Sequence, residues 1–575
     1  MEIVRREVGR PDKLPTSIPP LLRRVFAARN ITCSRDLDKS LGVLFPPSQL
    51  LGIGPAVDLL ESAVRGDRRI LIVADFDADG ATSCALAVRA LSAMGARDVE
   101  YVVPNRFEYG YGLTPEIVAV AARRNPHLLI TVDNGISSLA GVWEARARGI
   151  KVLITDHHLP GAQLPNADAI VNPNQPHCGF PSKHLAGVGV IFYVMSALRG
   201  RFRDTDWFRQ RSIPMPNMAQ FLDLVALGTV ADVVPLDGNN RALVEQGLRR
   251  IRAGRCTPGV RAMVEIAGRD QTRLTASDLA FALGPRLNAA GRLQDMGLGI
   301  ECLLSDDDAA ARTMALRLDA LNQERRVIEA EMQEQAISDL DRLELTNVNL
   351  PFGVCIYDEQ WHQGVIGILA GRIRERLHRP VIAFAADKDG AIKGSARSVP
   401  GLHIRDSLDA VAARNPGLIT RFGGHAMAAG LTISVQDFEA FSTAFDGEVR
   451  RCLSADDLNC RVLSDGELTP GEFTLDVAQQ LRDAGPWGQG FPEPLFDGVF
   501  EVLSHRVLGE KHLKMTLRVP GNDGCIDAIG FNKALDYGAP ERAARVRLAY
   551  RLDVNEYRGV RNVQLVVEHI AVPPR

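Results

Sequence analysis

Short, continuously apolar runs separated by helix-like stretches characterise the first half of the chain. Three such runs lie at Arg69–Ala74, Leu128–Val132 and Val152–Thr155. Apolar runs that do not alternate with polar residues are typical of parallel strands that helices cover on both faces. The pattern therefore predicts an α/β domain, which we place at residues 51–238, behind an irregular, proline-containing lead-in at residues 1–50.

A helical region follows, with one long amphipathic helix near its end. Apolar residues recur there at spacings of three, four and seven, which place them on one face of a helix. They are Met314, Leu318, Leu321, Ile328 and Met332. Pro351 closes this region, which we place at residues 239–350. The helix is expected to join two folded parts.

The rest of the chain changes character twice. Val354–Tyr357 and Pro380–Phe384 are strand-like runs of a second α/β domain, placed at residues 351–455. From residue 456 to residue 575, short strand-like runs alternate with Gly, Asn and Asp turns, as in a small β-barrel. The expected fold class is therefore α/β, with two α/β domains joined by a long helix and a C-terminal β-barrel.

Composition narrows the possible functions without identifying one. The net charge is −3, from 67 basic and 70 acidic residues, which argues against a polybasic binder but leaves room for a local basic groove. The nine cysteines are scattered, which favours reduced thiols and a cytoplasmic location. The sequence has no apolar run of membrane-spanning length, no secretory signal, no phosphate-binding loop and no dinucleotide fingerprint. We therefore expect no membrane partner.

Acidic residues recur where the apolar runs of the first domain end. The first run leads into Asp75, Asp77 and Asp79, the second into Asp133, and the third into Asp156-His157-His158. Asp232 follows a fourth apolar run, Leu227–Ala231, and we expect it at an equivalent strand end. Ligands of parallel α/β sheets bind beyond the carboxyl ends of the strands. These acids are therefore expected to converge in one crevice.

Carboxylates that converge repel one another unless cations offset their charge. Oxygen ligands with one or two imidazoles suit Mn²⁺ or Mg²⁺, and two ions about 3.5–4 Å apart are used for in-line attack on a phosphate. A single Asp after a strand is more often a helix cap, and Asp75–Asp79 alone could be a calcium loop. The interpretation as a calcium-binding loop fails because Leu86 occupies the position at which that loop needs a Glu. The combination favours a two-ion centre.

These motifs, taken in order, resemble the DHH phosphoesterase superfamily. Asp-x-Asp-x-Asp-Gly, Asp-Asn-Gly and Thr-Asp-His-His are followed by further matching segments up to about residue 430. These segments are Ala226–Leu236, Gly284–Arg292, Trp361–Gly367, Ser395–Ser398 and Gly423–Gly430. The resemblance implies that Asp77, Asp79, Asp133, His157 and Asp232 are metal ligands. It implies catalytic roles for His158, at the scissile phosphate or in support of the centre, and for Asp75.

The resemblance also implies a DHH-associated domain that closes over the substrate, and a terminal oligonucleotide-binding (OB) fold. Substrate-binding residues implied in this way are Arg106, Arg286, Arg292, Ser395, Arg397, Gly424 and His425. In the terminal part, Lys511, Lys514, Arg518, Tyr550, Arg551 and Tyr557 are candidates for binding a single strand. For the aromatic ones, filling the barrel core is an equally good interpretation.

The bacterial members of this superfamily that the chain most resembles degrade single-stranded DNA in the 5′→3′ direction. The resemblance therefore implies a Mn²⁺- or Mg²⁺-dependent exonuclease of recombination and repair that releases 5′-mononucleotides. It also implies a single-stranded-DNA-binding protein and a repair helicase as partners, and a monomeric enzyme. One alternative is a DHH phosphodiesterase that acts on short oligonucleotides. Another is a non-enzymatic scaffold, which the complete set of acids disfavours.

Overall fold

The computed structural model describes residues 2–104, 112–342, 350–424, 426–459, 461–521, 524–534, 545–557 and 559–571, with backbone alone at 339–342 and 557. Contacts divide the chain into two units. One contains Lys39–Ser454 and Gly488–Gly490, and the other contains Met1–Asp38, Ala455–Trp487 and Phe491–Arg575. Each unit is described by itself.

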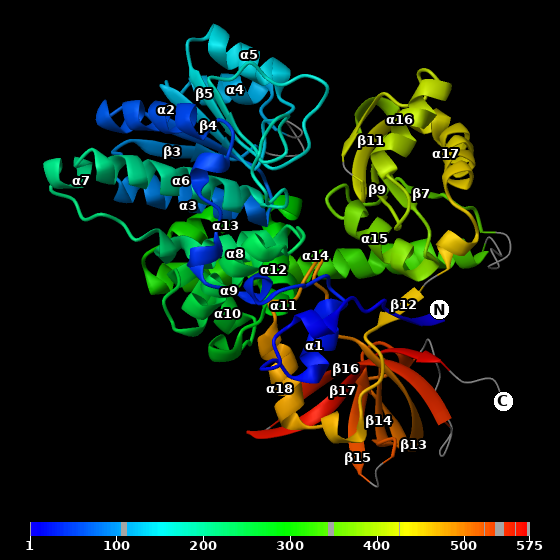
Figure 1. The fold of residues 1–575 in the computed structure, drawn as a ribbon. Helices are drawn as coiled ribbons and strands as arrows, with labels where there is room; N and C mark the ends of the chain where they lie inside the picture. The colour runs from blue at the N-terminus through cyan, green and yellow to red at the C-terminus, as the bar shows by residue number, and fades with distance from the viewer. Residues whose placement is uncertain are drawn as a thin grey trace. The chain divides into compact units, whose positions relative to one another are not determined.

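The first unit contains a five-stranded parallel sheet of order β3-β2-β4-β5-β6 (Figure 1). The strands are β2 (Ile70–Ala74), β3 (Val99–Val102), β4 (Leu128–Val132), β5 (Lys151–Thr155) and β6 (Ala169–Val171). Every residue of β2 and β4 is buried, which confirms the parallel sheet that the continuous apolar runs predicted.

Helices cover both faces of this sheet. One face packs against α4 (Pro115–Ala122) and α5 (Leu139–Ala147), through a core that includes Leu71, Val118 and Val142. The other face contacts α3 (Ala78–Ala93) and α6 (Gly187–Asp204). Two further helices of this part are α2 (Ile53–Arg65) and α7 (Trp207–Gln210).

A set of helices follows the parallel sheet and ends in the longest helix of the described residues. The set is α8 (Leu222–Ala231), α9 (Gly238–Arg252), α10 (Pro258–Ile266), α11 (Ala276–Asp278), a π-helical turn (Leu279–Leu283), α12 (Gly284–Leu293) and α13 (Gly297–Leu304). The last, α14 (Asp308–Arg342), contacts α10 and α12 near its start and α15 further on (Figure 1). The long connecting helix is thus confirmed.

One expectation about this region is wrong. Asp232 follows the helix α8, as its C-terminal cap residue, and does not follow a strand. The run that ends at Ala231 is buried on every side, so its helical period leaves no polar stripe in the sequence. A short, fully apolar run cannot be assigned to helix or strand from periodicity alone.

A second, mixed sheet of order β10-β11-β9-β8-β7 lies in the same unit. Its strands are β7 (Val354–Asp358), β8 (Val381–Ala386), β9 (Ala391–Arg397), β10 (Arg421–Gly424) and β11 (Ala428–Ser434). Only β7 and β8 pair in parallel. Its helices are α15 (Ile366–Leu377), α16 (Ile404–Arg414) and α17 (Phe438–Cys452). Met332 and Ala336 of α14 share a hydrophobic core with α15, β7 and β8, so the long helix packs against the mixed-sheet part.

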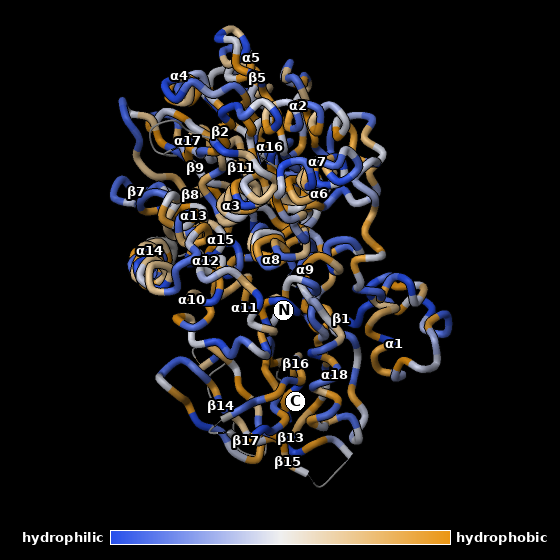
Figure 2. The backbone as a smooth tube through the Cα atoms, turned by 90° about the vertical axis from the view of Figure 1, so that its left-hand side faces the viewer, coloured by the Kyte–Doolittle hydropathy of each residue, from blue (hydrophilic) through white to orange (hydrophobic). Residues whose placement is uncertain are grey.

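The second unit is built on a closed barrel of order β13-β14-β15-β17-β16. The strands are β13 (Phe496–Leu508), β14 (His512–Arg518), β15 (Cys525–Gly530), β16 (Arg545–Tyr557) and β17 (Val560–Ala571), with α18 (Leu475–Ala484) beside them. Buried and outward residues alternate along β14, and its hydropathy alternates accordingly (Figure 2). The predicted C-terminal barrel is confirmed.

The N-terminal segment belongs to the barrel unit. Strand β1 (Glu2–Arg5) pairs in parallel with β12 (Arg461–Ser464), and α1 (Pro20–Ala27) follows it. Two residues after the end of α1, the guanidinium of Arg29 donates two hydrogen bonds to the buried carboxylate of Asp465, at 2.8 and 3.0 Å. Residues that looked like an irregular lead-in therefore form ordered structure with a part of the chain more than 400 positions away.

Two further sequence expectations concern cysteines and membranes. The eight described cysteines are all free thiols. Among the described residues, no single helix is long and apolar enough to cross a membrane. One pair bent by 85°, Leu41–Gln49 with Ile53–Arg65, meets that test by length and composition alone.

Candidate metal centre

Acidic and histidine side chains gather at the carboxyl edge of the parallel sheet. Among the described residues, three overlapping groups place a ligand atom of each member within 4.8 Å of the others. The groups are Asp79 with His157 and Asp232, Asp75 with Asp77 and Asp133, and Asp133 with His157 and His158. The structure thus brings together all five residues that were predicted as metal ligands.

The loop after β2 supplies two of these carboxylates by different means. Asp77 caps α3, because its Oδ1 accepts the backbone N–H groups of Asp79 and Gly80 at 2.9 and 3.0 Å. Asp77 is thus a helix cap and a member of a metal-binding group at once. The Asp79 carboxylate accepts the N–H groups of Gly187 and Val188, at 2.6 and 2.9 Å, where α6 begins. A helix N-terminus therefore holds the buried Asp79 in place.

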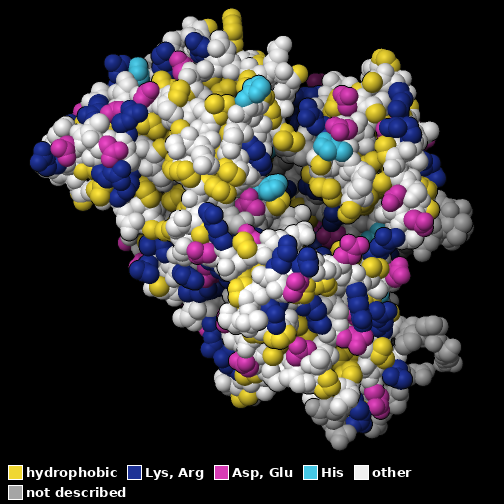
Figure 3. Space-filling model, in the orientation of Figure 1, with side chains coloured by type: hydrophobic (Ala, Val, Ile, Leu, Met, Phe, Trp, Pro, Cys, Tyr) yellow, Lys and Arg dark blue, Asp and Glu magenta, His cyan; other side chains and the backbone are white. Residues whose placement is uncertain are grey.

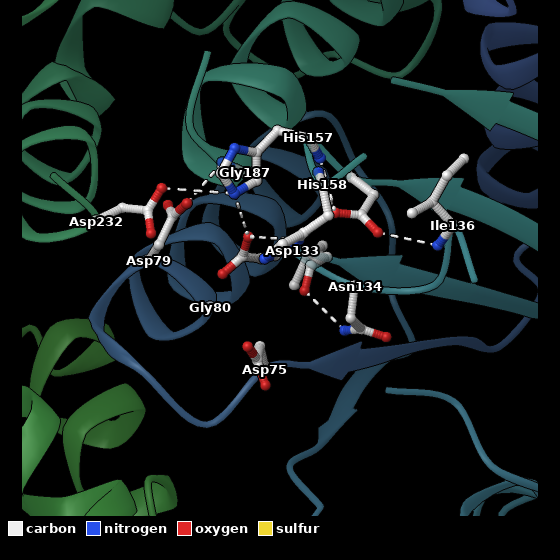
Figure 4. A network of polar contacts seen from close by, with 12 residues as sticks. Asp75, Asp79, Gly80, Asp133, Asn134, Ile136, His157, His158, Gly187 and Asp232 are labelled. Atoms are coloured by element: carbon white, nitrogen blue, oxygen red, sulfur yellow. Dashed lines mark hydrogen bonds and ion pairs between the residues drawn. The ribbon is translucent and has the colours of Figure 1, made fainter. Parts of the chain in front are cut away.

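The imidazole of His157 is the centre of the cluster (Figure 4). Its Nε2 lies 3.2 Å from Asp133 Oδ1 and 3.5 Å from Asp232 Oδ2. Asp133 has a φ of 62°, in the left-handed region, because the chain turns sharply at the end of β4. Gly187 packs against it so closely that a Cβ there would lie 2.6 Å from the Asp133 Cβ. Asp133 is thus held tightly against the start of α6, where only a glycine fits.

The electrostatics of the cluster fit divalent cations. Burial and the neighbouring carboxylates raise the pKa of Asp79 to about 7 and that of Asp232 to about 8. The same causes raise the pKa of Asp133 well above its ordinary value. Carboxylates that repel one another in a buried site bind positive charge strongly. Oxygen and imidazole donors are the set that Mn²⁺ and Mg²⁺ accept, so the residues fit these ions.

His158 has a different partner from His157. Its Nδ1 lies 2.7 Å from Asp156 Oδ1, and Asp156 also accepts the backbone N–H of Ile136 at 2.9 Å. Burial alone would raise the pKa of Asp156, but the charge of His158 and the hydrogen bond between the two lower it to about 2. Burial opposes a charge on His158, yet Asp156 raises the pKa of His158 to about 10.

Asp156 is a functional candidate to which the sequence assigned no role. It is fully buried, and its contacts orient the His158 ring. The signal was present, because Asp156 is the first residue of the Asp-His-His triplet. The sequence alone did not show whether its carboxylate turned toward the ions or toward the adjacent histidine.

The mixed sheet places a hydroxyl and a guanidinium side by side. Ser395 and Arg397 lie on one face of β9, and Arg397 Nη1 donates to Ser395 Oγ at 3.2 Å. The start of α15 covers them, since a Cβ on Gly367 would come within 2.9 Å of Ser395 Oγ and of Arg397 Nη2. A serine, an arginine and a helix N-terminus together form a candidate anion site.

The glycines of the predicted segment Gly423–Gly430 have two different roles beside this candidate site. Gly430 of β11 is paired with Ser395, and Gly423 of β10 is paired with Gly430, so this row carries no side chains next to the serine. Gly424 is paired with Ala429 in the neighbouring row, and a Cβ on Gly424 would lie 2.4 Å from the Ala429 Cα. Gly424 is therefore required for strand packing, and Gly423 and Gly430 leave the open floor.

The predicted arginines have protein partners in the structure. Arg286 forms an ion pair with Asp319 of α14 at 2.8 Å, and Arg292 Nη1 donates to the Gly364 carbonyl at 3.0 Å. Phosphate binding by either arginine would require a change of partner, and it stays a prediction. Arg106 and His425 lie outside the described residues.

The barrel candidates divide by burial. Tyr550 is fully buried among Phe496 and Phe500, so the prediction that it stacks on a base is wrong and the barrel-core interpretation holds. Three of the basic candidates form ion pairs. The pairs are Lys514 with Asp527, Arg518 with Glu501, and Arg551 with Glu493 and Glu568. Lys511 is exposed, and the side chain of Tyr557 lies outside the described set.

One face of the molecule is mixed in charge and hollowed. Figure 3 shows basic and acidic side chains interspersed over one face, without a single large basic field. The same face is hollowed between the part with the parallel sheet and the part with the mixed sheet, both within the first unit.

Three sequence families match successive segments of the chain. The DHH family N-terminal domain matches residues 69–229, the DHHA1 domain matches residues 349–451, and the RecJ OB domain matches residues 464–569. The first segment contains the members of the metal-binding groups except Asp232, which lies just beyond it. The second contains the Ser395–Arg397 pair, and the third contains nearly all of the closed barrel.

Relatives match over nearly the whole length. The chain is 55% identical to a single-stranded-DNA-specific exonuclease RecJ of Dickeya dadantii over 99% of this chain and 98% of that one. It is 53% identical to the Escherichia coli protein of the same name over 99% of each. A crystal structure of RecJ with Mn²⁺ from Thermus thermophilus is 31% identical, with a TM-score of 0.80, over 97% of this chain and 77% of that one. A crystal structure of exonuclease RecJ bound to manganese is 35% identical, with a TM-score of 0.57, over 70% and 95%.

Proposed function

The chain belongs to the RecJ family of DHH-domain exonucleases, and from this premise we propose that it degrades single-stranded DNA from the 5′ end to 5′-mononucleotides. The enzyme is a metal-dependent phosphodiester hydrolase whose cofactor is Mn²⁺ or Mg²⁺. The observation that carries the proposal is the buried convergence of Asp79, Asp133 and Asp232 on His157. In a non-enzymatic scaffold, the repulsion between these buried carboxylates would only destabilise the fold.

The proposed ligands of two ions are Asp77, Asp79, Asp133, His157 and Asp232. Bound ions would acidify a water molecule for attack and offset the negative charge that develops on the phosphate. Asp75 lies within the group that contains Asp77 and Asp133, which supports a role for it beside the ions. Backbone N–H groups at the start of α6 keep the Asp79 carboxylate oriented toward His157 and Asp232.

His158 is proposed to contact the scissile phosphate. Its Nδ1 lies 2.7 Å from Asp156 Oδ1, and the same side chain belongs to a group with Asp133 and His157, which supports a position beside the ions. A carboxylate on one imidazole nitrogen fixes both the ring orientation and the position of the proton. Asp156 therefore supports catalysis through His158.

Recognition of the 5′ end is proposed to occur on the mixed sheet. The Ser395 hydroxyl, the Arg397 guanidinium and the N-terminus of α15 can bind a terminal phosphate, and the glycine row beside them admits it. A strand whose 5′-phosphate is held there would present its first phosphodiester bond to the metal centre. The polarity of degradation would then follow from selective binding of the 5′-terminal phosphate.

Selectivity for single strands is proposed to rest on shape. A strand would lie in the hollow between the two α/β parts. An entrance too narrow for duplex would exclude double-stranded DNA. Contacts of this kind track the backbone, so binding should be tolerant of sequence and weakened by salt.

The direct test uses single strands of DNA labelled at either end. We expect release of mononucleotides from the 5′ end, loss of activity with a chelator and recovery on addition of Mn²⁺. Equal degradation of a strand whose 5′ end is blocked would refute the polarity. Faster turnover of dinucleotides than of long strands would favour the alternative, a DHH phosphodiesterase of short oligonucleotides.

The cellular setting is proposed from the family alone. It comprises cytoplasmic action in recombination and repair, a monomeric enzyme, and a single-stranded-DNA-binding protein and a repair helicase as partners. The proposed domains are a DHH domain at 51–238, a helical region at 239–350, a DHHA1 domain at 351–455 and an OB-like domain at 456–575, after the segment 1–50. The three family matches support this division.

A further inference from the structure

The two histidines after β5 are held by their backbone as well as by their side chains. Asn174 donates from Nδ2 to the carbonyl oxygen of His157 at 2.6 Å. Asn172 donates from Nδ2 to the carbonyl oxygen of His158 at 2.9 Å. The Oδ1 of Asn172 also accepts the backbone N–H of Asn174 at 2.7 Å. One asparagine thus orients the other, and each fixes one peptide of the histidine loop.

The turn that carries these asparagines is itself anchored. Lys183 Nζ donates to the carbonyls of Pro173 and Cys178, at 2.7 and 2.6 Å. The side chain of Asn172 is fully buried, so its hydrogen bonds have no competition from bulk water. The histidine loop therefore rests on a rigid support and does not hang freely from β5.

The position of this turn in the fold explains what it contributes. Asn172 follows β6 directly, at the same edge of the sheet where β2, β4 and β5 deliver their acids. Strand β6 delivers no acid there, and it delivers two amides that point at the loop from the next strand. A ligand whose peptide is fixed loses less freedom when it binds a metal ion, so affinity rises.

We propose that Asn174 and Asn172 are positioning residues of the metal centre. Asn174 holds His157 in place for a metal ion, and Asn172 holds His158 in place for the scissile phosphate and also orients Asn174. The inference deepens the proposed function and rests on it.

The test measures Mn²⁺ binding to metal-free protein by calorimetry, without any substrate. Asn174→Ala should raise the Kd for Mn²⁺ about tenfold to a hundredfold, the range typical when the group behind a metal ligand is lost. Its kcat on single-stranded DNA should return to within about threefold of the parent at saturating Mn²⁺. Asn172→Ala should raise the Kd and also lower kcat about tenfold or more, even at saturating Mn²⁺.

Gln175→Ala is the matched control. Gln175 lies in the same turn, is buried, and donates to the carbonyls of Leu51 and Ile170, but not to the histidines. Its Kd for Mn²⁺ should stay within about twofold of the parent, and thermal unfolding in chelator should show all three variants folded.

An unchanged Kd in Asn174→Ala, or an equal loss in Gln175→Ala, would overturn the inference. If the parent protein fails to degrade single-stranded DNA, the proposed function fails, while the Mn²⁺ titrations still decide this inference.

Discussion

The two five-stranded sheets of the first unit solve opposite electrostatic problems. The parallel sheet gathers Asp79, Asp133 and Asp232 around one imidazole and raises their pKa values. The mixed sheet sets Ser395 and Arg397 beside a helix N-terminus and a row of glycines. One edge is built for cations and the other face for an anion, which are the two charges that a metal-dependent enzyme acting on phosphate must handle.

Topology accounts for the difference. Parallel strands end at one edge, so residues that follow β2, β4 and β5 meet although they are far apart in sequence. In the mixed sheet, β9 and β11 are antiparallel, and residues meet by register across a face, as Ser395 and Gly430 do. A site at an edge uses residues just after strands, whereas a site on a face uses alternate residues within strands.

The largest effect is expected from removing one charge of the parallel sheet. Asp133→Asn keeps the shape and tolerates the left-handed φ of 62° at this position. It should lower kcat by about 10³-fold at a fixed Mn²⁺ concentration, because a ligand and its charge are lost. In chelator it should raise the unfolding temperature, because repulsion within the buried cluster falls.

Asp168→Asn is the control for that pair of measurements. Asp168 lies beside the same sheet but is paired with Lys151 at 2.8 Å. Its replacement should leave kcat unchanged and should lower, or not change, the unfolding temperature. If Asp133→Asn is destabilised in chelator as much as Asp168→Asn, the view of a repulsive cluster is wrong.

A smaller effect is expected when all the ligands remain but one of them, Asp133, is displaced. In Gly187→Ala the new Cβ would lie 2.6 Å from the Asp133 Cβ, so Asp133 must move. We expect kcat/KM to fall about tenfold to a hundredfold, with weaker Mn²⁺ binding in the same titration. Gly200→Ala, on the same helix with no atom within 4 Å of its Cβ, should have parent-like activity.

How far the sequence predicted these two sites depends on their topology. Residues that follow apolar runs are visible in a sequence, so Asp77, Asp79, Asp133 and His157 were identified correctly as one cluster. Asp232 was assigned to the cluster but to the wrong element, since a fully buried helix has no periodic signature. Register across antiparallel strands has no such trace, so the sequence indicated the glycine segment but not that Gly423 and Gly430 are the ones in the row of Ser395.

The barrel unit shows the same limit from another direction. As an aromatic residue, Tyr550 could stack on a base or fill the barrel core, and its side-chain type does not distinguish the two. The alternation along β16 and the closure of the barrel place its ring inside. Likewise, Glu2–Arg5 pairs with Arg461–Ser464, a segment far away in the sequence, and no local pattern predicts this pairing. Long-range pairing was the information that the sequence lacked.

On the mixed sheet, a crowding variant should change recognition more than turnover. In Gly367→Ala the new Cβ would come within 2.9 Å of Ser395 Oγ and Arg397 Nη2. We expect KM for 5′-phosphorylated strands to rise about fivefold to tenfold, with kcat and Mn²⁺ binding near those of the parent.

Its control is Gly371→Ala on the same helix, whose Cβ has no atom within 4 Å. The control should keep the parent KM. The distinction between a cation edge and an anion face would fail if Gly367→Ala lost Mn²⁺ affinity, or if KM rose equally for strands with a 5′-hydroxyl.

The smallest effect is expected at Glu448, an acid of the mixed-sheet domain that is paired with arginines. Glu448 of α17 is buried and contacts Arg451 at 2.7 Å as well as Arg414. The hydrogen bonds from Arg451 lower the pKa of Glu448 to about 2, against the opposing effect of burial, and Arg414 adds to the lowering. A lowered pKa means stabilisation that is complete above the unfolded value, near pH 4.5, and is lost as pH falls toward 2. Glu448→Gln should therefore cost about 1 kcal/mol at pH 7 and clearly less at pH 2, where the carboxyl is about half protonated in the folded protein. Chemical unfolding at both pH values measures this, with the exposed Glu439→Gln on the same helix as the control. An equal loss at both pH values would show that packing, and not charge, holds this carboxylate.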